Sequence, residues 1–155
     1  MPIRKILAPT DLSELSCTGV RLALELARSE GAEIVLYHVI GVAEGWFRDH
    51  EDLNPVRPVL DEEKRRLSAF VNERFCDHVP SEKIRQIVDF GVAYKKIVEE
   101  ADFEKVDLIV MSTHGRTGFN HLLLGSVTER VIAGASCPVL TVPSSRRARM
   151  KPLAA

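Results

Sequence analysis

The chain has 155 residues, of which 45% are hydrophobic and 28% are charged, and its formal net charge is -1. A chain of this length folds as one domain that buries about 70% of the surface of the unfolded chain, and this composition excludes a disordered protein. The near-zero charge excludes long-range attraction to nucleic acid or to an anionic membrane, so we expect neither as a partner.

The first predicted strand is the apolar run Ile6 to Ala8, and a helix follows it. We expect Ser13 to cap this helix at its start and Gly31, which tolerates a left-handed conformation, to end it. Residues at helical spacing give the helix one apolar face, which consists of Leu15, Gly19, Leu22, Ala23, Leu26 and Ala27.

The second predicted strand, Ile34 to Ile40, is almost continuously apolar, as a strand covered on both faces requires. The segment from Gly41 to Pro58 has no usable period, and loops of this length are typically lids or disordered segments. We expect Trp46 and Phe47 in this segment to pack against the sheet edge. A second helix follows and opens with Asp61-Glu62-Glu63, acids that the positive end of the helix dipole favours. Its apolar face consists of Leu60, Leu67, Val71 and Phe75.

The second half of the chain repeats the alternation of strand and helix. Ile84 to Val88 and Leu108 to Met111 predict two strands. The helix between them has an apolar face made of Tyr94, Ile97, Val98 and Ala101. A fourth helix is predicted to open with Ser126 and Glu129 as a capping box and to end at Cys137-Pro138. Val139 to Val142 predicts the fifth strand.

This order of elements predicts an open doubly wound α/β domain with a five-stranded parallel sheet and helices on both faces. We assign residues 1–143 to the domain and residues 144–155 to a solvated basic tail that contains Arg146, Arg147, Arg149 and Lys151. The start of the chain has no signal-peptide pattern and no segment resembles a membrane span, so a cytoplasmic protein is expected. Cys17, Cys76 and Cys137 show no metal-binding spacing, and we expect them to be reduced and buried.

Ligands of such sheets bind beyond the carboxyl ends of the strands, where the strand order reverses. Polar turns follow the first and fourth strands, over Ala8 to Asp11 and over Ser112 to Gly118. The second turn leads to the start of the fourth helix, where unpaired N–H groups and the helix dipole attract phosphate. Gly115, Gly118 and Gly125 allow close backbone approach there. Glycines also suit any tight connection, and neither a P-loop nor a dinucleotide fingerprint is present in the sequence.

The second turn resembles the nucleotide loop of the universal stress protein family, which is written G-x2-G-x9-G-[ST]. Gly115, Gly125 and Ser126 match three of its four positions. Ser112 stands where the first glycine does, a change that we expect to weaken phosphate binding at most. The resemblance covers residues 3 to 142, with further matches at Lys5 to Asp11 with Ser13, at Leu36 to Ile40 and at Cys137 to Val142.

The resemblance implies an adenine nucleotide alpha hydrolase-like fold with strand order 3-2-1-4-5, and it implies ATP or AMP as the ligand. Pro9, Thr10 and Asp11 would border adenine and ribose, and Val39 would meet adenine through its backbone. The ribose and phosphates would be wrapped by Ser112, Thr113, His114, Gly115, Arg116, Thr117 and Gly118, and enclosed by Gly125, Ser126, Val127 and Thr128. A magnesium ion held mainly by the phosphates would need few protein ligands, and the histidine spacing predicts no protein-ligated metal.

We expect a homodimer joined through the last strand, Val139 to Val142, because an exposed apolar edge strand invites pairing and this strand forms the two-fold contact in the resembling family. The implied function is that of a regulatory stress-response protein with at most slow ATP hydrolysis. Only Arg116 and Asp11 are candidates for the groups that phosphoryl transfer needs, and we assign no catalytic residue. One alternative is a protein of the same fold that serves interactions and no longer binds nucleotide. Another is an adenylating enzyme, which the absence of a substrate domain and of a clear catalytic pair disfavours.

Overall fold

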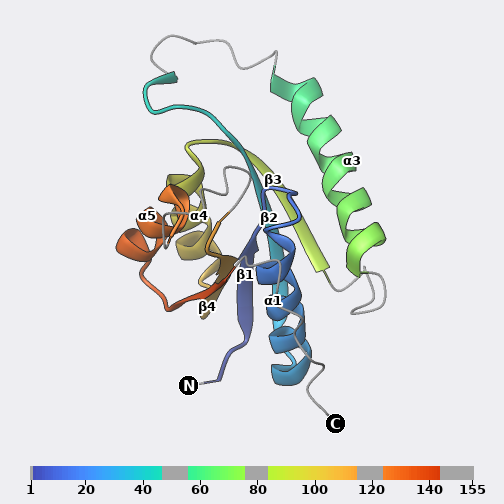
Figure 1. The fold of residues 1–155 in the computed structure, drawn as a ribbon, viewed down its shortest axis with the longest axis vertical. Helices are drawn as coiled ribbons and strands as arrows, with labels where there is room; N and C mark the ends of the chain where they lie inside the picture. Colours follow the sequence, from blue (N-terminus) through green and yellow to red (C-terminus); the bar gives the residue numbers. More distant parts are fainter. Residues whose placement is uncertain (1, 47–55, 76–83, 115–123, 144–155) are drawn as a thin grey trace.

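The computed structural model describes residues 2–46, 56–75, 84–114 and 124–143, and its core is a five-stranded parallel sheet of order β3-β2-β1-β4-β5 (Figure 1). The strands are β1 (Lys5–Pro9), β2 (Glu33–Gly41), β3 (Ile84–Gly91), β4 (Leu108–Ser112) and β5 (Val139–Val142). The predicted strands and their order are therefore confirmed, and β5 lies at one edge of the sheet.

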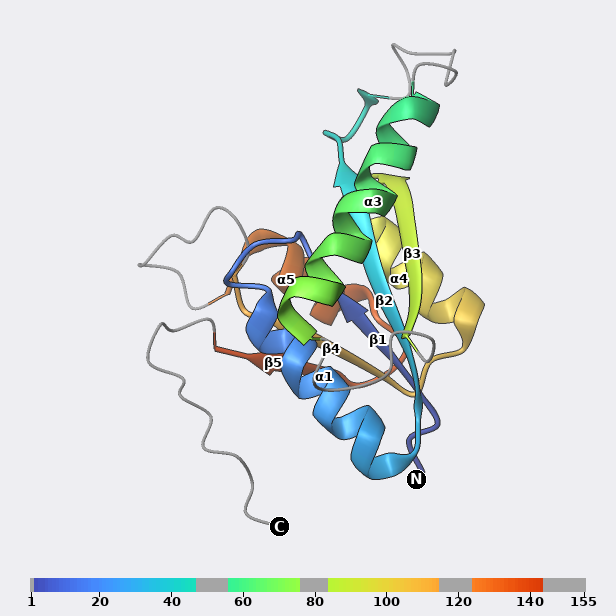
Figure 2. The same cartoon turned by 90° about the vertical axis from the view of Figure 1, so that its right-hand side faces the viewer.

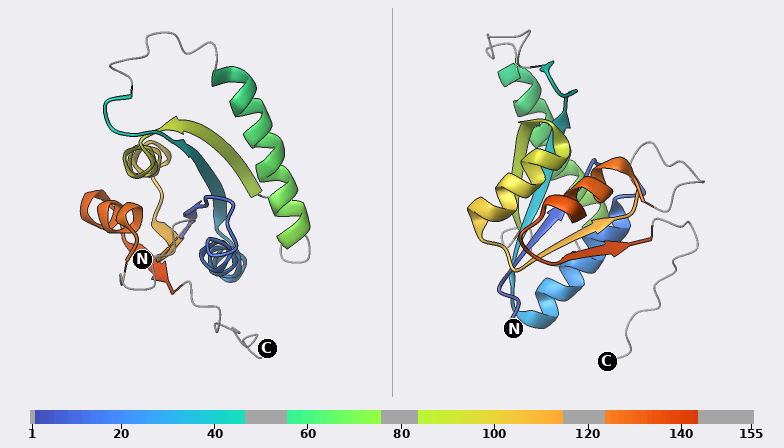
Figure 3. Two further views of the ribbon diagram at one scale, coloured as in Figure 1. Left: turned by 45° about the horizontal axis from the view of Figure 1, so that its top comes forward. Right: turned by 90° about the vertical axis from the view of Figure 1, so that its left-hand side faces the viewer.

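Helices cover both faces of the sheet, as the alternation of elements predicted. They are α1 (Cys17–Glu30), α3 (Val56–Phe75), α4 (Ala93–Glu104) and α5 (Ser126–Gly134). Helices α1 and α3 lie on one face (Figure 2), and α4 and α5 lie on the other, which the right-hand view of Figure 3 brings forward. Two apolar clusters result, one on each side, and the fully buried Ile6 and Leu7 of β1 belong to opposite clusters. None of the described helices has both the length and the apolarity that a bilayer span requires.

The start of α1 differs from its prediction. The helix begins at Cys17, after Ser16, and Ser13 lies in the turn that precedes it. The hydroxyl of Ser13 donates to Asp11 Oδ1 at 2.5 Å, so this serine stabilises the turn and does not cap the helix as an N-cap residue. Gly31 ends the helix as predicted, with a φ of 67° and its N–H donating to the Ala27 carbonyl.

The start of α3 is also earlier than predicted. The helix begins at Val56, so Asp61, Glu62 and Glu63 lie beyond its first turn and are not placed at its positive end. The loop predicted over residues 41–58 is correspondingly shorter, because β2 runs to Gly41 and α3 takes in residues 56–58. Trp46 packs edge-on against Phe90, with ring centroids 5.0 Å apart, as expected for packing at the sheet. Phe47 lies outside the described residues.

The capping box predicted for α5 is wrong. Gly125 occupies the N-cap position, Ser126 is the first helical residue, and no side chain caps the helix. The reason is a tertiary contact: the Gly125 N–H donates to the Thr113 carbonyl at 2.7 Å, which fixes the start of the helix to the end of β4. A side chain at Gly125 would place its Cβ 3.1 Å from the same carbonyl, so glycine suits the position. The helix ends at Gly134, ahead of the predicted Cys137-Pro138.

Candidate functional site

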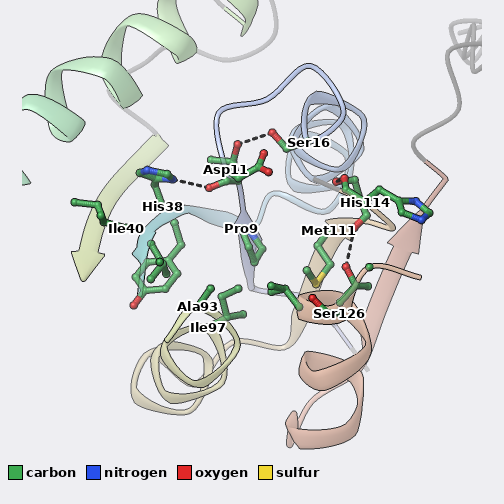
Figure 4. A pocket seen from close by; sticks show the side chains of 18 of the residues that line it. Pro9, Asp11, Ser16, His38, Ile40, Ala93, Ile97, Met111, His114 and Ser126 are labelled. Carbon is green, nitrogen blue, oxygen red and sulfur yellow. Dashed lines mark hydrogen bonds between the residues drawn. The ribbon is translucent and has the colours of Figure 1, made fainter. Parts of the chain in front are cut away.

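A cavity of about 510 Å³ opens at the carboxyl edge of the sheet, where β1, β2 and β4 end (Figure 4). Its volume is that of a small-molecule site, for which cavities of about 300–1,000 Å³ are typical. Figure 4 shows His38 and Ser126 on opposite sides of Pro9. The walls are formed by Pro9, Thr10, Asp11, Ser16, Tyr37, His38, Val39, Ile40, Gly41, Glu63, Ala93, Ile97, Met111, Ser112, His114, Gly125, Ser126, Val127 and Thr128.

The turn between β1 and α1 forms one side of this cavity and is fixed by side-chain hydrogen bonds. Asp11 Oδ1 accepts from the Ser13 N–H at 3.0 Å as well as from the Ser13 hydroxyl. The buried hydroxyls of Thr10 and Ser16 lie 2.8 Å apart, and Thr10 Oγ1 also accepts from the Leu12 N–H. Leu12 adopts a left-handed conformation with a φ of 63°. The Asp11 carboxylate is thus held at the cavity by a turn with little freedom to move.

The opposite side of the cavity is the junction of β4 and α5. Thr128 is buried, and its hydroxyl donates to the Ser112 carbonyl at 3.1 Å. The Ser112 hydroxyl donates to the His114 carbonyl at 2.9 Å. The side chain that replaces the first glycine of the family pattern is therefore bonded to its own turn. Together with the bond from Gly125 to Thr113, these contacts set the position of the first turn of α5.

The first turn of α5 presents backbone donors to the cavity. Glu129 donates its N–H to the Gly125 carbonyl, which is the first intrahelical bond. Among the described residues, no acceptor pairs with the amides of Ser126, Val127 and Thr128, all of which line the cavity. Unpaired amides at a helix start, together with the partial positive charge of the helix dipole, form a site for an anion such as phosphate.

Two ionisable side chains that sequence reasoning missed line the side of the cavity nearest α3. His38 Nδ1 lies 2.8 Å from the Thr10 carbonyl, and His38 Nε2 lies 3.2 Å from Glu63 Oε2. Both side chains are largely buried, with 5% and 14% of their surfaces exposed. His38 stood out in the sequence as a polar residue within an apolar strand. Nothing in the sequence singled out Glu63 from the two acids before it.

Tyr37, which also lines the cavity, carries a neutral hydroxyl. Its hydroxyl donates to Asp89 Oδ2 at 2.9 Å, and Asp89 also pairs with Lys96 at 3.2 Å. Burial, and next the negative charge of Asp89, raise the pKa of the Tyr37 phenol far above its ordinary value. Tyr37 therefore acts as a hydrogen-bond donor and stays uncharged at all ordinary pH values.

The structure brings together most of the residues that the sequence predicted for the site. Ten of them line the one cavity: Pro9, Thr10, Asp11, Val39, Ser112, His114, Gly125, Ser126, Val127 and Thr128. Thr113 does not line it and acts through its carbonyl, which holds Gly125. Gly115, Arg116, Thr117 and Gly118 lie outside the described residues. The missed residues at the end of β2 and the start of α4, such as Gly41 and Ala93, follow the same strand-end rule that found the others.

No metal site accompanies the cavity in the part of the chain that the structure describes, since no three His, Cys, Asp or Glu side chains there are grouped to hold an ion. The described cysteines, Cys17 and Cys137, are free thiols, of which Cys17 is buried and Cys137 is half-buried. Burial raises the pKa of both thiols. Cys76 is not among the described residues.

Comparison with known proteins links this architecture to one family. Residues 2–143 match the model of the universal stress protein family. Universal stress protein MJ0531 of Methanocaldococcus jannaschii is 34% identical, over 93% of this chain and 84% of that protein. A universal stress protein of Thermus aquaticus is 50% identical, over 90% of this chain and 98% of its own length.

Comparison with solved structures also finds proteins of similar fold. The structure of MJ0577 from Methanocaldococcus jannaschii has a TM-score of 0.69 and 33% identity, covering 92% of this chain and 97% of that one. A universal stress protein solved in complex with cAMP has a TM-score of 0.61 at 23% identity, covering 94% of this chain and 100% of that one, and it is similar in fold.

Proposed function

This chain belongs to the universal stress protein family, and from that premise we propose that it binds an adenine nucleotide, ATP or AMP, in the cavity at the carboxyl edge of the sheet. The observation that carries the proposal is that the amides of Ser126, Val127 and Thr128 at the cavity wall pair with no acceptor among the described residues. They suit a phosphate chain without any lysine nearby. A relative of the same fold was solved with cAMP, which is itself an adenine nucleotide.

In this proposal, different residues of the cavity contact the adenosine and the phosphates. Asp11 and the backbone of Val39 would meet the adenosine, and the first turn of α5 would hold the phosphates. Gly115, Arg116, Thr117 and Gly118 would complete the phosphate side. A magnesium ion would be held mainly through the phosphates, because the described residues supply no cluster of ligands for one.

The proposed role is regulatory, in a cytoplasmic homodimer that responds to stress and hydrolyses ATP slowly at most. A bound nucleotide changes the population of the surface conformations that partners recognise. The exposed side chain of Leu140 on the edge strand β5 supports pairing of two copies through this strand. The free thiols of Cys17 and Cys137 are compatible with a reducing compartment.

The test is to identify the ligand directly. Protein purified without added nucleotide is denatured, any released small molecule is identified by mass, and ATP and AMP are titrated into stripped protein by calorimetry. The proposal expects an adenine nucleotide in the released fraction or saturable binding of ATP or AMP at one site per chain. Absence of both would favour the alternative of an interaction protein that no longer binds nucleotide.

A further inference from the structure

A relay of polar contacts joins α3, β2 and the turn after β1 along one wall of the cavity. Glu63 of α3 lies against His38 of β2, and His38 in turn contacts the carbonyl of Thr10 at the end of β1. Thr10 then holds the turn that carries Asp11, through its contacts with Ser16 and Leu12. Figure 4 shows the contacts of His38 and Ser16 as dashed lines converging beside Asp11. All the residues of this relay except Leu12 line the cavity.

The chemistry of the relay requires a proton between His38 and Glu63. The Thr10 carbonyl can only accept, so His38 Nδ1 must carry a hydrogen. A neutral histidine then has a lone pair on Nε2, and this lone pair would face Glu63 Oε2 at 3.2 Å, acceptor against acceptor. The contact is stable only when one further proton is bound, on Nε2 or on the carboxyl group.

No other described group donates a hydrogen bond to Glu63 Oε2 in place of this proton. Glu63 Oε2 is buried, and no hydrogen bond reaches it from the described residues. Glu63 Oε1 accepts from Arg66 Nη1 at 2.6 Å, so the guanidinium of Arg66 contacts the carboxylate oxygen that does not face His38. From β3 the register partner of His38 is the apolar Val88. On the side of the turn between β1 and α1, the further polar side chains that line the cavity are those of Asp11 and the uncharged Ser16.

We propose that His38 and Glu63 are positioning residues, which hold one proton in common and thereby fix the β1–α1 turn for the adenosine part of the nucleotide. The inference rests on the proposed function. When the pair loses its proton as pH rises, the two acceptors repel each other, Glu63 of α3 no longer contacts His38 of β2, and the turn that carries Asp11 loses a support. Nucleotide affinity then falls when the pair loses this proton.

The decisive variant is Glu63→Gln, because its amide can donate to the lone pair of a neutral His38 and still accept from Arg66 through its oxygen. The relay then needs no additional proton. The matched control is Glu62→Gln, one residue earlier on α3, where the glutamate is exposed and pairs only with Arg65 among the described residues. Thermal unfolding followed by circular dichroism verifies that all three proteins are folded at each pH.

The experiment is calorimetric titration of AMP from about pH 6 to about pH 8.5, the range that brackets histidine ionisation. The phosphate of AMP ionises identically with every protein. The ratio of the Kd of wild type to that of Glu63→Gln therefore reports only the pH dependence that comes from the His38–Glu63 pair. We expect this ratio to rise by about tenfold across the range, as loss of one linked proton allows, while the ratio of wild type to Glu62→Gln stays constant. In the ligand-free wild type, the ring ¹⁵N signals of His38 should titrate with the midpoint seen in the affinity.

Equal pH profiles for wild type and Glu63→Gln, with AMP bound by both, would overturn the relay and leave the proposed function standing. A His38 titration with a midpoint unrelated to the affinity would overturn it as well. If neither protein binds AMP or ATP at any pH, the proposed function and the relay fail together.

Discussion

Gly19 of α1 lies so close to Ser112 at the end of β4 that a Cβ atom at position 19 would be 2.5 Å from the Ser112 amide nitrogen. The same Cβ would lie 2.8 Å from the carbonyl carbon of Met111. Because these neighbours are backbone atoms in a buried strand, they cannot yield as a flexible side chain would. Helix α1 therefore lies directly on the strand that carries the phosphate side of the cavity.

Gly19→Ala should destabilise the protein by about 1–3 kcal/mol, because overpacking against β4 outweighs the gain of alanine in helix propensity. Displacement of Ser112 should also weaken AMP binding. Urea unfolding and calorimetry measure the two effects. Gly134→Ala is the control, since its Cβ would meet Val98 at 3.5 Å, an ordinary contact. A Gly19→Ala protein as stable as wild type would show that α1 can move away from β4 at little cost.

Thr128→Val should lower the free energy of unfolding by about 1–3 kcal/mol, because the buried carbonyl of Ser112 loses the hydroxyl that donates to it. Nucleotide affinity should fall as well, since this bond sets the distance between β4 and the first turn of α5. Thr128→Ser retains the hydroxyl and should keep most of both properties. Valine and serine variants of equal affinity would mean that the hydroxyl does not position the turn.

Glu104 should make stability dependent on pH in the acid range. Its buried carboxylate accepts from Lys5 Nζ at 3.0 Å and from Arg85 at 2.7 Å, and first the Lys5 bond and then those to Arg85 lower the pKa of Glu104. A carboxyl with a lowered pKa stabilises the fold at pH values above its unfolded pKa of about 4.5, and this stabilisation is lost as pH falls through the folded pKa.

Glu104→Gln should therefore cost about 1–3 kcal/mol at pH 7, where Lys5 and Arg85 lose their charged partner. The difference from wild type should shrink toward about pH 3, where the wild-type carboxyl is protonated as well. Urea unfolding at the two pH values measures this. A difference that stays constant down to the lower pH would rule out the ion pairs as its source.

Leu140→Asp should convert a dimer to a monomer, if two copies pair through β5. Leu140 is 39% exposed on the edge strand, and a buried carboxylate without a partner would oppose association. Light scattering coupled to gel filtration gives the mass. Phe103→Asp removes a more exposed apolar side chain, 78% exposed on α4, and should leave the mass unchanged. A wild-type protein with the mass of one chain would exclude the dimer.

The apolar runs predicted the strands because a parallel sheet buries both faces, so hydrophobicity alone identifies strands such as Leu108–Ser112, while the strand order was predicted from the family resemblance. Helix starts were less predictable. Ser13 and Ser126 are both good caps by residue type, yet Ser13 lies in the turn before α1, where its hydroxyl donates to Asp11 and accepts from the Ser16 N–H, and Gly125, held by Thr113, takes the N-cap position ahead of Ser126. The first of these contacts lies within one turn, and the second joins the end of β4 to the start of α5, which only the tertiary structure brings together.

Some residues of the candidate site could likewise be predicted from the sequence and others could not. Residues at strand ends, such as Asp11 and Ser112, could be found because topology places all these ends at one edge. Glu63 could not be found, because it is one of three consecutive acids and only the rotation of α3 against β2 turns it toward His38. A sequence pattern gives the period of a helix and does not give the pairing of one ionisable side chain with another across elements.

The most direct test of the account is to remove one backbone amide from the start of α5. Ser126→Pro does so with little strain, because proline suits the first position of a helix and Gly125, with a φ of -71° and a ψ of 153°, has the extended conformation required before proline. Ser126→Ala removes only the hydroxyl and is the matched control. We predict that Ser126→Pro binds AMP at least about tenfold more weakly than Ser126→Ala, as loss of a charge-assisted hydrogen bond requires. Equal affinities of the two variants would contradict the claim that the amides of this turn hold the phosphate.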